Sequence, residues 1–216
     1  MIIAVDGPAA SGKGTLAAGL ARHYGLPHLD TGLLYRAGGC AVAELDGLPG
    51  FEVAAILAAK SIDTGHLDPE LLSTAEAGQL ASKVAVIGEV RAALFDFQRA
   101  FATQSSGAVL DGRDVGTNIA PDAEVKLFIK ADSKARMERR ARQFELKGLP
   151  VDRYALYHQI EQRDARDMAN PNGGFYPAPD AHLLDTTLLD IEAALRAAVA
   201  IVDGVMAEKS RSANLV

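Results

Sequence analysis

The fold of this chain is decided near its amino terminus by the stretch Gly7-Pro8-Ala9-Ala10-Ser11-Gly12-Lys13-Gly14-Thr15. The apolar run Ile2 to Val5 precedes it and is typical of a short, buried parallel strand. A helix is expected from about Lys13 to Tyr24, with Gly25 as its stop. Glycines in such a turn let backbone N–H groups point inward, and the helix N-terminus adds the positive end of its dipole. The stretch therefore predicts a loop that binds phosphate.

Two side chains of this loop are expected to carry chemistry. Lys13 can reach the β- and γ-phosphates of a nucleoside triphosphate, and Thr15 offers a hydroxyl to the phosphate or the metal shell. In the general phosphate-binding loop (P-loop) a Ser or Thr directly follows the lysine and binds Mg²⁺, but here Gly14 holds that place. We therefore expect phosphates and water to hold Mg²⁺, and the sequence names no direct protein ligand. Asp111 is the candidate to orient this water, although an ordinary strand-end aspartate is an equally good interpretation.

Further apolar runs alternate with helical patterns along the chain, near residues 27–29, 107–110, 125–129 and 182–184. This alternation predicts an α/β protein of the P-loop NTPase fold, with a five-stranded parallel sheet flanked by helices on both faces. Ligands of such sheets bind beyond the carboxyl ends of the strands. The expected strand ends are polar there: Asp6-Gly7, Asp30-Thr31, Asp111-Gly112 and Asp185-Thr186.

Two stretches interrupt this alternation within what we expect to be a single P-loop domain, residues 1–216. Residues 37–106 are helical in pattern and are interpreted as a substrate-holding segment. Residues from about 140 to 180 are densely charged and are interpreted as a mobile lid. A capping box formed by Thr187 and Asp190 is expected to open a last helix that ends near Met206, followed by a frayed tail.

Composition narrows the function classes. The chain is 49% hydrophobic and 23% charged, with a formal net charge of −6, which argues against a nucleic-acid polymer as partner. Its single cysteine, Cys40, cannot form an internal disulfide and suits a reducing cytosol. No run approaches the roughly 20 apolar residues that span a bilayer, and the amino terminus does not read as a signal peptide. We expect a cytoplasmic monomer that does not associate with membranes.

Three further motifs carry polar side chains at strand ends and on a helix: Leu29-Asp30-Thr31-Gly32-Leu33-Leu34-Tyr35-Arg36, Asp111-Gly112-Arg113-Asp114-Val115-Gly116-Thr117, and Arg163-Asp164-Ala165-Arg166-Asp167. The phosphate-binding loop and these three motifs stand in a specific order and spacing, and the chain also carries Ser82, Arg91 and the terminal Leu184-Asp185-Thr186-Thr187. In these motifs the chain resembles, almost end to end, the bacterial cytidylate kinase (CMP kinase) family of nucleoside monophosphate kinases. The form Gly-Lys-Gly-Thr in the loop is also found in nucleoside monophosphate kinases.

The resemblance implies ATP-dependent phosphorylation of CMP, and also of dCMP, in pyrimidine nucleotide metabolism, with ATP as phosphoryl donor and Mg²⁺ as cofactor. The loop Gly7 to Thr15 would bind ATP. By the matched positions, the base would be held by Ser82, Arg91 and Asp114. The CMP phosphate would be held by Arg36 and Arg113, with Thr31 beside them. Arg163 and Asp167 would lie near the ribose and the transferring phosphoryl group. Lys13, Arg113 and Arg163 would be catalytic.

The chemistry of cytosine agrees with the implied base pocket. An ionised carboxylate only accepts hydrogen bonds, so Asp114 suits the exocyclic amine of cytosine, and Arg91 can donate to the ring acceptors. Uracil carries an oxygen in place of that amine, so two hydrogen-bond acceptors, this oxygen and the carboxylate of Asp114, would face each other. The acceptor phosphate is already anionic at neutral pH, so positioning and charge neutralisation would suffice for catalysis without a dedicated base.

Plainer interpretations remain open for several residues. Ser82 could be an ordinary exposed helix serine, and Arg163 with Asp167 a surface pair four residues apart. Most of the arginine run could be a solvated helix face, with one or two members closing over ATP: Arg136, Arg139, Arg140 and Arg142. Alternative functions are a P-loop kinase for UMP, AMP or shikimate, or a non-catalytic NTP-binding regulatory protein.

The chain departs from the family pattern in two places. Members usually carry an arginine three residues beyond the position of Asp167, where this chain has Asn170 at the start of the loop 170–174. Arg166, one helical turn earlier, is a candidate to supply the missing charge. The region between Arg36 and Arg91 also looks shorter than in long-form members and lacks clear strand hairpins.

Overall fold

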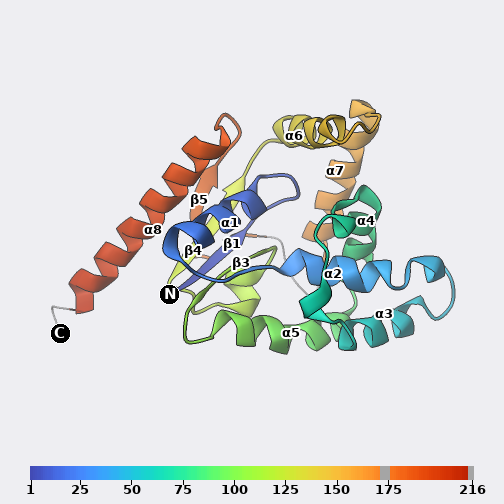
Figure 1. The fold of residues 1–216 in the computed structure, drawn as a ribbon, viewed down its shortest axis with the longest axis horizontal. Coiled ribbons are helices and arrows are strands. Elements are labelled where there is room, and N and C mark those ends of the chain that lie inside the picture. The colour runs from blue at the N-terminus through green and yellow to red at the C-terminus, as the bar shows by residue number, and fades with distance from the viewer. Residues whose placement is uncertain (171–175, 214–216) are drawn as a thin grey trace.

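The computed structural model describes residues 1–170 and 176–213, which fold around one parallel sheet (Figure 1). The sheet has five strands in the order β2-β3-β1-β4-β5, and every pairing is parallel, as the sequence predicts. The strands are β1 (Ile2–Asp6), β2 (His28–Asp30), β3 (Ala108–Gly112), β4 (Val125–Lys130) and β5 (His182–Asp185).

The register of the strands brings their polar ends to one edge of the sheet. Asp6 of β1 lies opposite Gly112 of β3, and Asp111 of β3 lies opposite Asp30 of β2. Because all strands run in one direction, their carboxyl ends meet where the P-loop leaves β1. The sequence placed its candidate site at this edge.

Both faces of the sheet are covered by helices, because successive side chains of a strand point to opposite faces. Ile3 packs with α1 (Lys13–Tyr24) and α8 (Ile191–Ala213) in the larger core. Ala4 packs on the other side with α5 (Gly88–Ala102). This arrangement confirms the predicted two-faced α/β architecture and fixes the P-loop between β1 and α1.

The stretch between β2 and β3 is helical throughout. It forms α2 (Thr31–Cys40), α3 (Phe51–Lys60), α4 (Ala75–Val84) and α5, which share a hydrophobic core of their own. No strand is described between β2 and β3, which agrees with the lack of clear strand hairpins in the sequence between Arg36 and Arg91. The charged stretch forms α6 (Ser133–Leu146) and α7 (Arg153–Met168), packed around a small separate core at the upper right of Figure 1.

The last helix corrects the sequence prediction at both ends. Asp190 precedes α8 and its Oδ1 accepts from the backbone N–H of Ala193 at 2.7 Å. The backbone N–H of Thr187 instead donates to Oδ1 of Asp185 at 2.9 Å, so the predicted capping box with Thr187 is wrong. The helix continues to Ala213, although its packing on the core ends at Met206 and residues 207–212 are exposed. Within the described ranges, no helix is both long and apolar enough to cross a membrane.

A buried carboxylate fastens the turn after β3 to the end of β1. Oδ1 and Oδ2 of Asp6 accept from the N–H groups of Val115 and Gly116 at 2.9 and 2.8 Å. These donors open a single π-helical turn, Val115–Ile119, which follows directly on Asp114. Burial raises the pKa of Asp6 to about 6, although the two N–H donors oppose the rise. Asp6 therefore holds the backbone of the Arg113-Asp114 motif at the cost of a buried charge.

We predict that Asp6→Asn changes how stability depends on pH. The pKa of Asp6 is higher in the folded chain than its ordinary 3.8, so the unfolded chain releases this proton first as the pH rises. The free energy of unfolding of the parent, relative to the variant, should fall by roughly 2–3 kcal/mol between pH 4 and 6 and stay level above about 7. Urea unfolding at each pH measures this difference. A difference that is flat from pH 4 to 6 would contradict the prediction.

Candidate active site

The P-loop adopts a backbone that its glycines make possible. Gly7 has a φ of +154°, and a Cβ there would lie 2.4 Å from the carbonyl oxygen of Ile129. Gly12, at the start of α1, has a left-handed φ of +91°. Both positions exclude larger residues, the first by contact and the second by conformation.

Three arginines, one from the turn after β3 and two from α6, bind the carbonyl oxygens of this loop. The Nη1 atoms donate as follows: Arg113 to Gly7 at 3.0 Å, Arg136 to Ala9 at 3.2 Å and Arg139 to Ser11 at 3.2 Å. The C=O and N–H of a planar trans peptide unit point in opposite directions. In the units that begin at Ala9 and Ser11, the N–H groups of Ala10 and Gly12 therefore point away from the arginines, whereas the unit that begins at Gly7 has no N–H because Pro8 follows.

These contacts overturn the interpretation of the arginine run on α6 as a mainly solvated face. Arg136 is 3% exposed and pairs with Asp164 of α7, with Nη1 3.1 Å from Oδ1. Arg139 also donates to the backbone oxygen of Thr186, and Arg140 is partly buried. Only Arg142 of the four is exposed. The side chains turn inward because α6 lies across the P-loop, which spacing along the helix could not reveal.

Lys13 faces a buried carboxylate across the loop. Its Nζ lies 3.5 Å from Oδ2 of Asp111, whose Oδ1 lies 2.8 Å from Nε2 of His28. Burial lowers the pKa of Lys13, and the charge of Arg113 adds to this effect. Burial also opposes ionisation of Asp111, but Lys13 and His28 outweigh it and lower the pKa of Asp111 below its ordinary value. Lys13 and Asp111 therefore form an ion pair at the mouth of the loop.

Oδ2 of Asp111 has the surroundings that a metal's water shell requires. Among the described residues it has no hydrogen-bond partner, although it is buried. A Cβ at Gly14 would lie 3.6 Å from it, so the glycine leaves this oxygen open toward the loop. Thr15 is exposed at the start of α1. These groups fit Mg²⁺ held mainly by phosphate and water, and no cluster of three or more His, Cys, Asp or Glu occurs in the described ranges.

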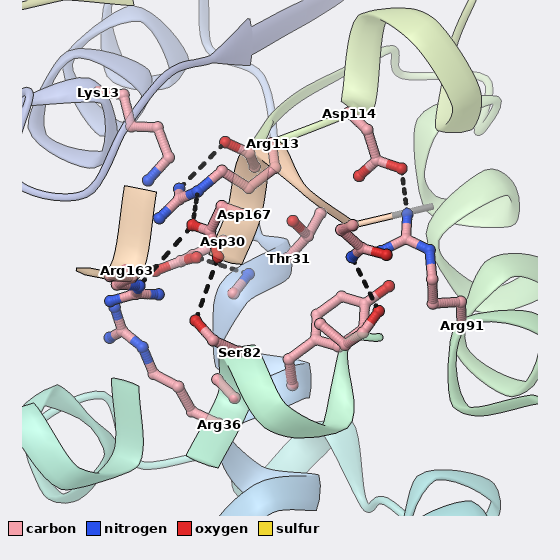
Figure 2. Close-up of a pocket in the computed structure, with 16 residues that line it drawn as sticks. Lys13, Asp30, Thr31, Arg36, Ser82, Arg91, Arg113, Asp114, Arg163 and Asp167 are labelled. Carbon is pink, nitrogen blue, oxygen red and sulfur yellow. Dashed lines mark hydrogen bonds and ion pairs between the residues drawn. The ribbon is translucent and has the colours of Figure 1, made fainter. Parts of the chain in front are cut away.

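The pocket beside Lys13 gathers every substrate residue that the sequence proposed (Figure 2). They come from α2, α4, α5, α7 and the turn after β3, which only the fold brings together. The predicted residues that line it are Thr31, Arg36, Ser82, Arg91, Arg113, Asp114, Arg163 and Asp167. The grouping of these side chains is thus observed, while their roles toward a nucleotide stay predictions.

One end of the pocket is built around Asp114. Arg91 of α5 donates to Oδ2 of Asp114, as Figure 2 shows, and Nδ2 of Asn118 donates to the same oxygen at 2.8 Å. The guanidinium of Arg91 lies 5.8 Å from the ring centroid of Tyr35. Thr31 does not point to this pair, because its hydroxyl donates to the backbone oxygen of Asp111 at 2.9 Å. A carboxylate and a guanidinium thus lie together against an aromatic ring.

The other end is built around Asp167. Its Oδ2 accepts from Nε of Arg113 at 2.9 Å, and its Oδ1 accepts from the hydroxyl of Ser82 at 3.2 Å. Nε of Arg163 lies 3.8 Å from Oδ2. Burial opposes ionisation of Asp167, but the charges of Arg113 and Arg163 lower its pKa below the ordinary value. Figure 2 shows this cluster facing Lys13.

Two plainer interpretations of this cluster are wrong. Ser82 is only 6% exposed, since α4 packs against α7, so it is not an ordinary surface serine. The side chains of Arg163 and Asp167 are 20% and 13% exposed and do not form a surface pair. Burial, together with the charge of Arg113, lowers the pKa of Arg163 to about 9.

A second hollow adjoins the first beside Ala9 and Ala10 and is strongly cationic. Its lining includes Arg140, one of the four arginines of which the sequence expected one or two to close over ATP. Nη2 of Arg140 donates to the backbone oxygen of Ser73 at 3.1 Å, and burial together with the charge of Arg36 lowers its pKa. Five cationic side chains converge here: Lys13, Arg36, Arg113, Arg140 and Arg163. Such a cluster suits the phosphates of two nucleotides.

Sequence reasoning missed several residues of the site. Asp30 and Tyr35 line the first pocket and lie inside a quoted motif, so their positions beside Thr31 and Arg36 were an available signal. Asn118 lies just beyond the motif that ends at Thr117 and binds Asp114 four residues earlier, so its signal was local. His28 carried no such signal, because Asp111 comes from another part of the chain.

Asn170 lies in the pocket, but Arg166 does not. Nδ2 of Asn170 donates to the backbone oxygen of Ala85 at 3.1 Å, and both residues line the first pocket. Nε of Arg166 donates to the backbone oxygen of Gln162 on its own helix, and it lines neither hollow. The rest of the predicted loop 170–174 lies outside the described residues. The charge near Asn170 thus comes from other arginines.

The chain has a P-loop between its first strand and its first helix, and beside the loop lies a pocket with a cationic end. This fold and this site are those of a P-loop phosphotransferase. The family model for cytidylate kinase matches residues 3–203. A cytidylate kinase of Xanthobacter autotrophicus is 54% identical over 203 residues, covering 94% of this chain and 97% of the relative. One of Rhodopseudomonas palustris (strain BisA53) is 48% identical over 211 residues, covering 98% and 100%. The chain belongs to the cytidylate kinase family.

A solved structure shares the fold. An uncharacterized protein from Eubacterium ventriosum superposes with a TM-score of 0.56 at 18% identity, covering 94% of this chain and 98% of that one. At this identity the likeness supports the architecture alone.

Proposed function

We propose that this chain transfers the γ-phosphoryl group of ATP to the phosphate of CMP, and also of dCMP. The observation that carries the proposal is the paired Asp114 and Arg91 at one end of a pocket whose other end is the cationic cluster beside Lys13. Family membership supports the same reaction. A nucleotide can bridge these ends, because its base needs a paired hydrogen-bond acceptor and donor while its phosphate needs cationic side chains.

ATP would bind along the loop from Gly7 to Thr15. The inward-facing N–H groups and Lys13 would hold its phosphates, and Lys13 would neutralise charge on the transferring group. Mg²⁺, when bound, would neutralise and orient the phosphates. Oδ2 of Asp111 would hold a water of the metal's shell, for which its buried position without a hydrogen-bond partner is the support. These roles use each polar atom in the position it already occupies.

CMP would bind across the pocket. Asp114 would accept from the exocyclic amine, while Arg91 and Ser82 would meet the other polar atoms of the base. Its phosphate would lie between Arg36 and Arg113, whose forked donors match two oxygens of one phosphate. Thr31 would act indirectly by holding α2 against β3 through Asp111.

The ribose and the transferring group would lie near α7. Asp167 would accept from a ribose hydroxyl with its orientation set by Ser82 and Arg113. Arg163 would meet the transferring phosphoryl group, since its guanidinium lines both hollows. An anion there would offset the repulsion that lowers the pKa of Arg163.

The two interruptions of the strand–helix rhythm would act as the moving parts. Residues 37–106 would hold the monophosphate and residues from about 140 to 180 would close as a lid. Arg140 and Lys147 of the lid both contact Ser73 of the other segment, Lys147 through its Nζ at 3.1 Å from Oγ. Closure along this contact would exclude water, which otherwise competes as phosphoryl acceptor.

A substrate panel separates this function from its alternatives. CMP and dCMP should be phosphorylated with ATP, and UMP, AMP and shikimate should be poor acceptors, as measured by coupled ADP release. A preference for another acceptor would refute the assignment of the base pocket. ATP binding with no transfer to any acceptor would favour a regulatory protein.

We predict that Lys13→Ala removes most phosphoryl transfer, with kcat falling on the order of 100-fold or more. The buried Asp111 also loses its closest cation, so thermal stability should fall as well. Steady-state kinetics and thermal melting measure the two effects. The exposed Lys134→Ala is the matched control and should retain parental turnover. Near-parental turnover in the Lys13 variant would refute the assigned role.

We predict that Asp114→Asn relaxes the preference for CMP over UMP. The asparagine amide can donate to the uracil oxygen, which the carboxylate cannot. A buried mispaired polar group costs roughly 1–3 kcal/mol, so the ratio of kcat/KM values should fall about tenfold or more. Asp96→Asn, an exposed change on α5, is the control. An unchanged ratio in the Asp114 variant would place this residue outside the base pocket.

We predict that Asn170→Arg lowers the KM for CMP severalfold. A hydrogen bond to a charged group contributes about 1.5–3 kcal/mol, roughly twice a neutral one. A further cation near Arg36 and Arg163 should also lower the melting temperature of the free protein. Arg166→Ala should leave the KM unchanged, since Arg166 lines neither hollow. If Asn170→Arg does not move the KM, position 170 lies outside the substrate contacts.

A further inference from the structure

His28 touches the ion pair at the mouth of the P-loop, yet it belongs to none of the motifs that identify the site. It opens β2, a strand of three residues at the edge of the sheet. The register pairs His28 with Val109 and Asp30 with Asp111, which lets the imidazole lie alongside the carboxylate of Asp111. Nε2 lies 2.8 Å from Oδ1, and the imidazole is 25% exposed.

The two oxygens of Asp111 are divided between two partners. Oδ1 meets His28, and Oδ2 faces Lys13 at 3.5 Å without a hydrogen bond from any described residue. The lowered pKa keeps Asp111 ionised, and an ionised carboxylate can only accept. Nε2 of His28 must therefore carry the proton of this hydrogen bond.

The terminal torsion of an aspartate is broad, so packing alone sets the direction of its oxygens poorly. A single donor fixed to Oδ1 restricts that torsion and thereby places Oδ2. Lys13 is a flexible side chain whose ammonium follows the nearest opposite charge. The position of the ammonium thus depends on the carboxylate, and that of the carboxylate on His28.

We propose that His28 is a positioning residue for phosphoryl transfer, which holds Asp111 by an Nε2–H···Oδ1 bond so that Oδ2 faces Lys13 and the P-loop. The inference rests on the proposed function, since it concerns the transfer step of that reaction. His28 lines neither hollow and has no part in binding CMP. Loss of its donor should therefore lower kcat and leave the binding of CMP intact.

The competing explanation is that His28 only ties β2 to β3. The backbone of these strands already pairs along Val109, Leu110 and Asp111, so this side chain would then add stability alone. Such a role would change the melting temperature in proportion to the lost bond and would not separate kcat from KM.

Three variants of the full chain test the proposal. His28→Leu removes the donor at similar volume, His28→Gln keeps an N–H donor at a similar reach, and His182→Leu is the control at the exposed start of β5. His28→Leu should lower kcat about tenfold, with the KM for CMP within about twofold of the parent. His28→Gln should restore most of the kcat, and His182→Leu should match the parent. An unchanged kcat in His28→Leu, or an equal loss in His28→Gln, overturns the proposal.

A spectroscopic measurement tests the bond without turnover and without a variant. The ¹⁵N resonances of the His28 imidazole in the nucleotide-free protein should show a protonated Nε2 at neutral pH. An unprotonated Nε2 overturns the proposal even if a variant fails to fold. If the parent does not phosphorylate CMP, the proposed function fails by itself, and the ¹⁵N result still decides whether His28 holds Asp111.

Discussion

Five cationic side chains converge on one hollow of this protein, and their mutual repulsion is the constraint on which the site depends. Two like charges about 4 Å apart repel by about 4 kcal/mol at an effective dielectric constant of 20. Burial, and after it the repulsion from neighbouring arginines, lowers the pKa values of Lys13, Arg140 and Arg163. Two carboxylates compensate from the rim, Asp111 beside Lys13 and Asp167 beside Arg113 and Arg163. The cluster is thus suited to anions, and under the proposed function phosphate groups would supply the missing negative charge.

The same arginines also shape the backbone. Arg113, Arg136 and Arg139 bind carbonyl oxygens of the P-loop, and the N–H groups of Ala10 and Gly12 point away from these arginines. Arg136 additionally pairs with Asp164 of α7. A movement of α6 and α7 would therefore act on the loop directly, which gives the proposed lid a mechanical connection to the site of transfer.

The end of the pocket around Asp114, the proposed base site, is electrically distinct from the cationic end. Asp114 and Arg91 neutralise one another, and Asn118 fixes the carboxylate on a second side. Asp6 binds the N–H groups of Val115 and Gly116 in the turn that follows Asp114. It is the last residue of β1, the strand that leads into the P-loop. One buried carboxylate thus sets the spacing between Asp114 and the P-loop. Under the proposed function, different residues would carry selectivity and catalysis, so the two properties could vary separately.

The sequence by itself determined the elements whose causes are local. The glycines of the P-loop, the strand before it and the stop of α1 at Gly25 follow from backbone conformation and short-range pattern. The polar strand ends could also be placed, because parallel strands must end at one edge. The resemblance to the family motifs then predicted the substrate residues, and the fold brought all of them into one pocket.

Tertiary structure alone decided the contacts between residues distant in the chain. Ser82 is buried because α4 packs on α7, and the arginines of α6 turn inward because that helix crosses the P-loop. Asp190 rather than Thr187 caps α8, since Thr187 is drawn to Asp185 at the end of β5. His28 meets Asp111 only through the register of β2 on β3. Local pattern records which face of an element is apolar, but the partner of a buried charge is set by where other elements pack, and that information is not local.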